Sequence, residues 1–369
     1  MRLLLTGATG FVGGAIAAEL ARRGLIDRTV FAVRADSPAH GLQRVRASLE
    51  RFALPPDLID RIGIDAILQV NLGDGEGIER LQIPDDFSHV IHCAALATFS
   101  NNPAIWASNV EGTLALARSV LRRNRLERWL QVGTAMSCGA GRAPPVAESW
   151  DDGAEDGEAH LVPYTRSKLA AERALRDLSG LPLVVARPSI VVGHTTLGTL
   201  PSPSIFWVFR MAFALERFTC APDDRIDVIP VDWCAQALVS LALKESLAHD
   251  LYHVSAGSAA SNRFTDIDKA YALACGTEPI AARYQRVGVT DLRSLVPLIE
   301  QKLGRVNRLL ILQALALYGG FAGLSYVFDN RRLLREGINP PPAFIDYISS
   351  CVKSSQDIPI AKQMAFDFK

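Results

Sequence analysis

Short apolar runs alternate with longer amphipathic stretches along the first half of the chain. The apolar runs have the length of strands, and the stretches between them have the period of helices. Strands are predicted at residues 3–5, 29–33, 66–70, 89–92, 129–132 and 181–186, and helices at 11–23, 41–52, 103–123 and 164–178. This alternation predicts an α/β fold, in which a doubly wound parallel sheet has helices on both faces and binds ligands at the carboxyl ends of its strands.

The pattern becomes irregular after residue 193, where we expect a smaller, mainly helical lobe. An apolar helix is predicted at 205–215, a strand at 226–231 and a helix at 233–243. The expected domains are a sheet domain of residues 1–193 to which 225–245 return, a substrate-binding lobe of residues 194–224 and 246–342, and a C-terminal tail of residues 343–369. The tail is expected because the prolines at 340–342 stop regular structure.

Residues 309–328 form an apolar stretch that contains no charged side chain. Its 20 positions are enough to cross a bilayer. Gly319 and Gly320 interrupt it, however, and Gln313 and Ser325 make it less apolar. A buried part of the second lobe is therefore the favoured interpretation. A lid that contacts a membrane surface or lipid, and a true membrane span, are the alternatives.

The composition narrows the class of protein. The chain has 39 basic and 39 acidic residues and no formal net charge, which is not the pattern of a general nucleic-acid binder. Its six cysteines form no CxxC pair, and its seven histidines form no cluster with metal-ligand spacing. These patterns predict reduced thiols, no metal site and a cytoplasmic protein. The apolar run after Met1 is too short for a signal-peptide core, which agrees with that location.

A glycine-rich loop, Gly7-x-x-Gly10-x-x-Gly13, directly follows the first predicted strand and opens the first predicted helix. Glycines permit a tight turn and let the backbone approach a pyrophosphate, and the helix amino terminus supplies N–H donors and a partial positive charge. Strand, loop and helix together therefore predict a dinucleotide site. Its candidate residues in this loop are Gly7, Thr9, Gly10, Phe11, Val12 and Gly13.

The end of the second predicted strand bears on the choice between NAD and NADP. Arg34 stands about where an NAD site would have an acid for the ribose hydroxyls, and its guanidinium suits a 2′-phosphate. Arg44 is a second candidate for this phosphate, whereas Asp36 would favour a ribose. We predict NADPH as the cofactor and keep NADH as the alternative.

Tyr164 and Lys168 lie four residues apart and would share one face of a helix that begins at Pro163. Lys168 can bind the ribose next to the nicotinamide, and its charge is expected to lower the pKa of Tyr164. Tyr164 can then protonate a carbonyl oxygen as a hydride reaches the carbon. A third hydroxyl is expected after the fifth strand, where Thr134 and Ser137 could each bind the substrate oxygen or cap a turn.

Acidic residues crowd the segment 148–158, shortly before Tyr164. Like charges and glycines are typical of a solvated loop, which is the favoured interpretation. The alternative is that this segment borders the substrate entrance.

Six segments together resemble the extended short-chain dehydrogenase/reductase family, over about residues 1–260. They are TGATGFVG (6–13), HCAA (92–95), NVEGT (109–113), GTAMSCG (133–139), YTRSK (164–168) and RPSIVVG (187–193). The resemblance implies a Rossmann-type sheet domain, with Thr134 as the catalytic hydroxyl, Tyr164 as proton donor and Lys168 as ribose ligand. It also implies cofactor contacts at Asn71, Leu72, Ala94, Pro188, Ile190 and Val191.

Within that family, the chain is most similar to thioester reductase domains and fatty acyl-CoA reductases. The likeness rests on the arginine-rich helix that follows Arg34, on RPSIVVG, and on the segments 227–232 and 252–255. One departure is Asn71, where relatives usually have an acid near the adenine. The match is weak from about residue 265 on, where substrate choice would be determined.

The resemblance implies an NADPH-dependent reductase that converts an acyl thioester to an aldehyde and, with a second hydride, to an alcohol. The acyl group would be lipid-like, and it would be delivered by CoA or by a separate acyl-carrier protein. The alternatives are an NAD(P)-dependent carbonyl or hydroxysteroid-type dehydrogenase, a sugar-nucleotide epimerase, and a non-catalytic dinucleotide-binding protein. Arg34 argues against an epimerase, because epimerases of this family favour an acid at that place.

Overall fold

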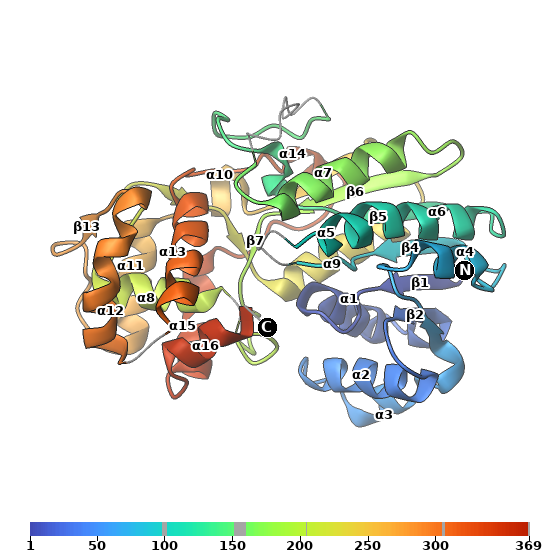
Figure 1. Ribbon diagram of the computed structural model, residues 1–369, viewed down its shortest axis with the longest axis horizontal. Coiled ribbons are helices and arrows are strands. Elements are labelled where there is room, and N and C mark those ends of the chain that lie inside the picture. Colours follow the sequence, from blue (N-terminus) through green and yellow to red (C-terminus); the bar gives the residue numbers. More distant parts are fainter. Residues whose placement is uncertain (98–101, 151–159, 204, 305–306, 368–369) are drawn as a thin grey trace.

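The computed structural model describes residues 1–97, 102–150, 160–203, 205–304 and 307–367 (Figure 1). The described residues build a parallel sheet of seven strands in the order β11-β6-β5-β4-β1-β2-β3. Its strands are β1 (Leu3–Thr6), β2 (Thr29–Val33), β3 (Ile67–Gln69), β4 (His89–His92), β5 (Arg128–Val132), β6 (Leu183–Pro188) and β11 (Leu251–Val254). This confirms the predicted α/β fold with a doubly wound parallel sheet.

The side chains of β1 explain why helices cover both faces of the sheet. Leu3 and Leu5 join the apolar core on one face, and Leu4 joins the core on the other. The helices of the first face are α1 (Phe11–Arg22), α2 (Pro38–Glu50) and α9 (Val231–Leu243), and those of the second are α4 (Gly75–Arg80), α6 (Thr113–Leu121) and α7 (Pro163–Arg176). Because β1 pairs with β2 on one side and β4 on the other, the strand order reverses there and opens a crevice at the carboxyl ends.

The second lobe lies beside this sheet and is mainly helical (Figure 1). Its helices are α8 (Phe206–Leu215), α11 (Phe264–Cys275), α12 (Val296–Leu303), α13 (Arg308–Ala322), α15 (Phe344–Ser355) and α16 (Ile360–Asp367). They share a separate apolar core rich in aromatic rings, in which Phe213 stacks on Tyr271 with ring centroids 4.0 Å apart.

Short elements connect these larger ones. The helical connections are η1 (Ile26–Arg28), α3 (Pro56–Asp60), η2 (Ile64–Ala66), α5 (Ala104–Trp106), the π-helical turn η3 (Ala107–Gly112), η4 (Ala135–Cys138), α10 (Gly257–Ala260), η6 (Val289–Leu295) and α14 (Arg331–Arg335). The short strands are β7 (Ile190–Val191), β8 (Arg217–Phe218), β9 (Arg225–Ile226), β10 (Val228–Ile229), β12 (Asn262–Arg263) and β13 (Gln285–Arg286).

The chain returns to the sheet in a different way from the one expected. The predicted strand at 226–231 is wrong as a member of the main sheet, because β9 and β10 pair only with β12 and β7 in small separate sheets. The strand that joins the main sheet is β11, at residues that the sequence analysis assigned to the second lobe. It was missed because Tyr252 and His253 interrupt the apolar pattern, although both side chains are fully buried.

Residues 343–369 differ from the expected tail in the part that is described. The prolines at 340–342 do end regular structure, but α15 begins directly after them at Phe344. Its buried side chains are Phe344, Tyr347, Ile348, Cys351, Val352 and Ser355, which form one helical stripe packed in the core of the second lobe. The prolines therefore start a new helix rather than a tail.

Helix α13 occupies most of the apolar stretch 309–328. Its side chains Ile311, Ala314 and Leu315 are buried in the second-lobe core, which agrees with the favoured interpretation of a buried part of that lobe. Across the described residues, every helix is too short or too polar to pass through a bilayer. Contact with a membrane surface stays a prediction.

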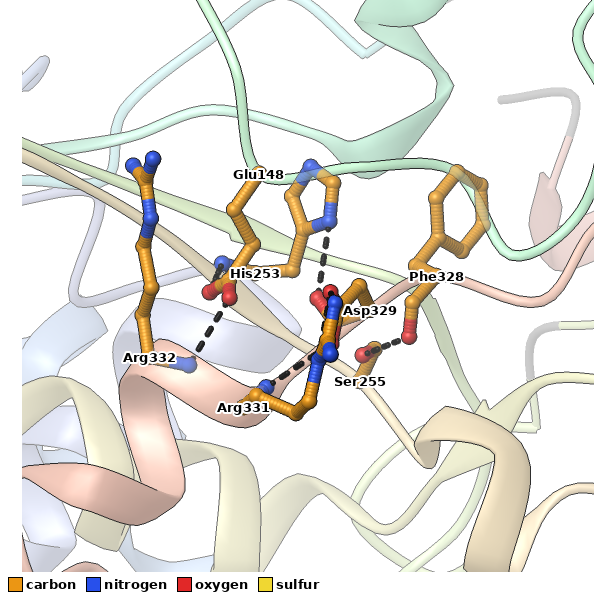
Figure 2. Close-up of polar contacts among 7 residues, drawn as sticks. All are labelled: Glu148, His253, Ser255, Phe328, Asp329, Arg331 and Arg332. Carbon is orange, nitrogen blue, oxygen red and sulfur yellow. Dashed lines mark hydrogen bonds and ion pairs between the residues drawn. The ribbon is translucent and has the colours of Figure 1, made fainter.

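The segment after α13 is fastened to the sheet domain by buried polar groups (Figure 2). The Glu148 carboxylate accepts a hydrogen bond from the backbone N–H of His253 at 3.0 Å and another from that of Arg332 at 2.8 Å. Burial raises the pKa of Glu148 to about 7. In the same segment, the backbone N–H of Phe328 donates a hydrogen bond to the Asp227 carboxylate at 3.0 Å. These bonds fix the position of the chain that follows α13 against the sheet domain. The rest of the acidic segment, residues 151–158, lies outside the described residues.

Candidate active site

One cavity of about 1160 Å³ runs from the glycine-rich loop along the carboxyl ends of the strands into the second lobe. The site candidates that the sequence analysis named through its motifs or the family resemblance line this cavity, with the exceptions of Ser137 and Asp36. Those lining residues are Gly7, Thr9, Gly10, Phe11, Val12, Gly13, Arg34, Arg44, Asn71, Leu72, Ala94, Thr134, Tyr164, Lys168, Pro188, Ile190 and Val191. Segments far apart in the sequence therefore meet at one place.

The glycine-rich loop has room for backbone only. Gly7 has a φ of +80°, and a Cβ there would lie 2.7 Å from the backbone nitrogen of Ala94. A Cβ on Gly13 would lie 2.1 Å from the carbonyl oxygen of Gly7. The loop also leads directly into the amino terminus of α1, whose first backbone N–H groups can bind an anion. This cradle fits the pyrophosphate of a dinucleotide.

Arginine side chains gather around Thr9 at this end of the cavity. The Arg44 guanidinium donates to the carbonyl oxygen of Arg34, and its Nη2 lies 3.5 Å from the hydroxyl of Thr9. Arg51, which the sequence analysis did not single out, donates to the carbonyl oxygen of Thr9 at 3.1 Å. The Asp36 side chain is 97% exposed and lies 3.3 Å from His40, outside this cavity. The charge near the adenosine end is therefore positive, which suits a phosphate.

Tyr164 and Lys168 lie in the first turns of α7, which begins at Pro163 as predicted. The Lys168 ammonium is buried and donates to the carbonyl oxygen of Val132 at 2.8 Å. It lies 5.9 Å from the centre of the Tyr164 ring. Burial lowers the pKa of Lys168. Lys168 and Tyr164 therefore share one face of the helix and one wall of the cavity.

The expectation that Lys168 lowers the pKa of Tyr164 is wrong for this arrangement. Burial raises the pKa of the phenol well above its usual value, and the nearby Cys93 and Glu172 add to that effect. At neutral pH this hydroxyl therefore keeps its proton, although the raised pKa makes it a weaker acid than a free phenol. The sequence could not reveal this, because the pattern YxxxK carries no information about how deeply its tyrosine is buried.

The cavity contains only one of the two candidate hydroxyls after β5. Thr134 lines it, and its hydroxyl oxygen also accepts a hydrogen bond from the backbone N–H of Met136 at 3.3 Å, so that it caps η4. Ser137 is fully buried and is not among the residues that line the cavity. The position of Thr134 agrees with the choice that the family resemblance implies.

A buried ion pair lies one turn beyond Lys168 on the same helix face. The Glu172 carboxylate accepts from Arg187 Nε at 3.0 Å and from Nη2 at 2.8 Å, and both side chains are fully buried. A Cβ on Gly133 would lie 2.0 Å from the other Glu172 oxygen. The pair therefore packs against the end of β5, joins α7 to β6, and supports both sides of the cavity. Its signal in the sequence is the spacing 164, 168, 172 on one helix face.

The second-lobe part of the cavity is lined mainly by apolar side chains. They come from α8, β8, β9, α11 and α13. These side chains are Val208, Phe209, Ala212, Phe218, Ile226, Phe264, Tyr318, Phe321 and Ala322. Ser354, Ile358 and Lys362, from the C-terminal segment, also line it. The sequence analysis expected 309–328 to be a buried part of the second lobe but did not identify these lining residues, because only the tertiary fold shows which helix faces turn inward.

The part of the chain that the structure describes contains no set of side chains that could coordinate a metal ion. No three or more His, Cys, Asp or Glu side chains there are grouped so that they could hold a metal ion. His92, at the end of β4, is instead a buried residue that shares hydrogen bonds with the hydroxyls of Thr6 and Thr113. Burial lowers the pKa of His92 to about 3.

This chain is similar to segments of longer curated proteins. A non-canonical nonribosomal peptide synthetase, hkm10 of Aspergillus hancockii, is 27% identical over 319 residues, which cover 81% of this chain and 31% of that protein. The aldehyde reductase lnbA of Aspergillus flavus is 24% identical over 69% of this chain and 26% of its own length. The chain thus spans less than a third of these curated relatives.

A solved structure has a similar fold over nearly the whole chain. The terminal R domain of the myxalamid PKS–NRPS biosynthetic pathway superposes with a TM-score of 0.75 and 24% sequence identity, covering 96% of this chain and 90% of that one. A family model described as male sterility protein, an NAD-binding family, matches residues 5–238. That range holds the glycine-rich loop and the Tyr164–Lys168 pair and covers more than half of the chain, which therefore belongs to this family.

Proposed function

We propose that this chain is an NADPH-dependent reductase that converts an acyl thioester to an aldehyde and a thiol. The observation that carries the proposal is the single cavity, which joins a dinucleotide cradle, a Tyr–Lys–Thr group and an apolar extension in the second lobe. A dinucleotide in the cradle would place its nicotinamide end toward Tyr164, beside Pro188 and Val191. The apolar extension would then hold the acyl chain.

The reaction follows from the side chains around the substrate carbonyl. Bound NADPH would supply the hydride to the carbonyl carbon. Tyr164 donates its proton to the carbonyl oxygen, and the Thr134 hydroxyl donates a hydrogen bond to the same oxygen. The resulting hemithioacetal returns its hydroxyl proton to the Tyr164 phenolate as the carbon–sulfur bond breaks. The thiolate then takes a proton from solvent, and aldehyde and thiol leave.

Lys168 is assigned to holding the cofactor ribose and to stabilising the phenolate. Its ammonium lies 5.9 Å from the centre of the Tyr164 ring. The phenolate forms only during turnover, and a buried positive charge beside it favours that form. Gly7, Gly10 and Gly13 would hold the pyrophosphate, and Arg34 and Arg44 the 2′-phosphate.

The choice of NADPH over NADH can be tested by removing the arginines. We expect Arg34→Ala combined with Arg44→Ala to raise the KM for NADPH by about tenfold or more, because each charge-assisted hydrogen bond to phosphate contributes about 1.5–3 kcal/mol. The KM for NADH should change little. Initial rates with both cofactors measure this, with Arg80→Ala as control, since that side chain is 78% exposed and pairs with Glu76. Equal changes in both KM values would refute the assignment.

The apolar extension supports a substrate with an extended acyl chain. Ala212 is a small buried residue of α8 that lines this part of the cavity. We expect Ala212→Phe to lower kcat/KM for a long acyl thioester by about tenfold or more, because an added ring of this size displaces packed groups at about 1–3 kcal/mol. A short acyl thioester should be affected much less. Ala259→Phe, at an exposed position, is the control, and equal losses for both chain lengths would contradict this role.

The thioester is proposed to arrive on CoA or on a separate carrier protein. The peptide synthetase among the relatives contains a segment similar to this chain, which supports a carrier-borne substrate. The aldehyde reductase among the relatives supports a second candidate, the reduction of a free carbonyl compound by the same residues. A second hydride transfer to the aldehyde would unite the two candidates, with an alcohol as the product.

The direct test is NADPH oxidation, followed by absorbance, with matched substrates. Long-chain acyl-CoA, the same acyl group on a carrier protein, and the corresponding aldehyde are compared, with NADH as the cofactor control. Consumption with either thioester supports the proposal, and release of free thiol confirms the bond that breaks. Turnover with the aldehyde alone would favour the carbonyl reductase. Inactivity with all three, together with copurified NAD, would favour the epimerase.

A further inference from the structure

Arg51 touches both halves of the cavity. It follows α2 directly, and its guanidinium lines the cavity. One amino nitrogen, Nη2, donates to the carbonyl oxygen of Thr9 at 3.1 Å and to the Ser48 hydroxyl at 3.0 Å. The other, Nη1, donates to the carbonyl oxygen of Pro201 at 3.4 Å. Thr9 belongs to the glycine-rich loop, and Pro201 belongs to a second segment that also lines the cavity.

The segment that contains Pro201, residues 199–203, forms part of the cavity wall. It is held from the second lobe by α15, because the Ser354 hydroxyl accepts from the backbone N–H of Thr199 at 2.8 Å and lies 3.1 Å from the Thr199 hydroxyl. Arg51 holds the same segment from the sheet domain. Proline has no N–H, so the carbonyl is the polar group through which the backbone of Pro201 can be anchored.

We propose that Arg51 couples the two ligands of the cavity, so that a dinucleotide at the glycine-rich loop and an acyl thioester beside residues 199–203 strengthen each other's binding. Arg51 is a positioning residue in this role. The inference rests on the proposed function, since it takes the acyl thioester as the second ligand.

The coupling follows from the geometry of a guanidinium. Arginine offers five N–H groups in one plane, and the described contacts use its two amino nitrogens. A phosphate at the start of α1 would lie beside Thr9 and would attract the Arg51 guanidinium. This attraction would hold the guanidinium in the orientation that also reaches Pro201. By linkage, the thioester must favour dinucleotide binding to the same degree.

The test measures the coupling directly by calorimetry on the complete chain. A thioether analogue of a long-chain acyl-CoA, which cannot be reduced, is titrated into the protein with and without saturating NADP⁺. For the unmodified chain, we expect NADP⁺ to lower the Kd of the thioether by about 5–150-fold, the range of an ordinary coupling between two sites. For Arg51→Gln, the ratio of the two Kd values should fall close to one, while the thermal midpoint of unfolding stays near that of the unmodified chain.

Two further variants separate coupling from folding. Arg51→Lys keeps the charge but cannot reach both carbonyl oxygens with a planar group, so it should retain a reduced ratio; it also serves if Arg51→Gln does not fold. Arg22→Gln is the matched control, because Arg22 donates to the carbonyl oxygen of Phe52 at 3.3 Å but does not line the cavity. It should keep the full ratio.

The outcomes distinguish this inference from the proposed function. If the unmodified chain binds both ligands independently, or if Arg51→Gln keeps the full ratio, the coupling role is wrong while the proposed function stands. If the thioether binds in neither state, the proposed function fails and the coupling fails with it. A ratio lost in Arg51→Gln, reduced in Arg51→Lys and kept in Arg22→Gln supports the inference.

Discussion

Replacing Tyr164 by phenylalanine is expected to lower kcat for thioester reduction by about 100- to 10,000-fold, the usual contribution of a positioned proton donor. The variant loses a single hydroxyl group at the wall where the cavity meets α7. Because burial keeps this phenol protonated, its proton is available to a carbonyl oxygen that gains negative charge during hydride transfer. Single-turnover oxidation of bound NADPH measures the chemical step directly.

Binding measurements distinguish a lost proton donor from a damaged site. The Kd for NADP⁺ should stay within a few-fold in Tyr164→Phe, whereas Lys168→Met should weaken NADP⁺ binding as well as turnover. Tyr326→Phe is the matched control, because that hydroxyl bonds to the backbone of Gly139 and Arg142 and does not line the cavity. A kcat for Tyr164→Phe close to that of the unmodified chain would show that another group delivers the proton.

The parts of the site that could be predicted from sequence are those fixed by local constraints. The glycine-rich loop is one, since a Cβ at Gly13 would lie 2.1 Å from the carbonyl oxygen of Gly7 within the loop itself. The pair Tyr164 and Lys168 is another, because a spacing of four residues on a helix already puts both on one face. Six of the seven strands of the sheet were predicted for a similar reason, since parallel strands buried on both faces read as short apolar runs.

The parts that sequence could not supply depend on contacts between distant segments. Arg51 matters only because Thr9 and residues 199–203 lie on either side of it. The second-lobe lining depends on how α8 and α13 are turned. The direction in which the pKa of Tyr164 shifts was predicted wrongly, since the sequence shows the nearby cation but not the burial of the phenol or its proximity to Cys93 and Glu172. In each case, the contacts and burial produced by the tertiary fold, rather than local pattern, determined the outcome.

Removing the carboxylate of the buried ion pair should have the largest effect on stability. We expect Glu172→Ala to lower the free energy of unfolding by about 3–5 kcal/mol, because it leaves the fully buried Arg187 guanidinium without this counter-charge. The exposed pair Glu76–Arg80 offers the comparison, with side chains 83% and 78% exposed. Glu76→Ala should cost about 0–1 kcal/mol, since water already screens that pair. Denaturant unfolding of both variants measures the difference.

A double replacement tests whether the cost comes from the unpaired charge rather than from lost packing. Glu172→Leu with Arg187→Met removes both charges and keeps most of the volume, so it should be considerably more stable than Glu172→Ala. A double variant as unstable as the single one would instead assign the loss to packing. The pair also touches the backbone next to Thr134 and joins α7 to the strand that leads to Pro188. The double variant should therefore be more stable than Glu172→Ala but have no higher kcat. Apolar side chains restore the packing of the core, but they do not hold the residues around the substrate carbonyl in fixed positions.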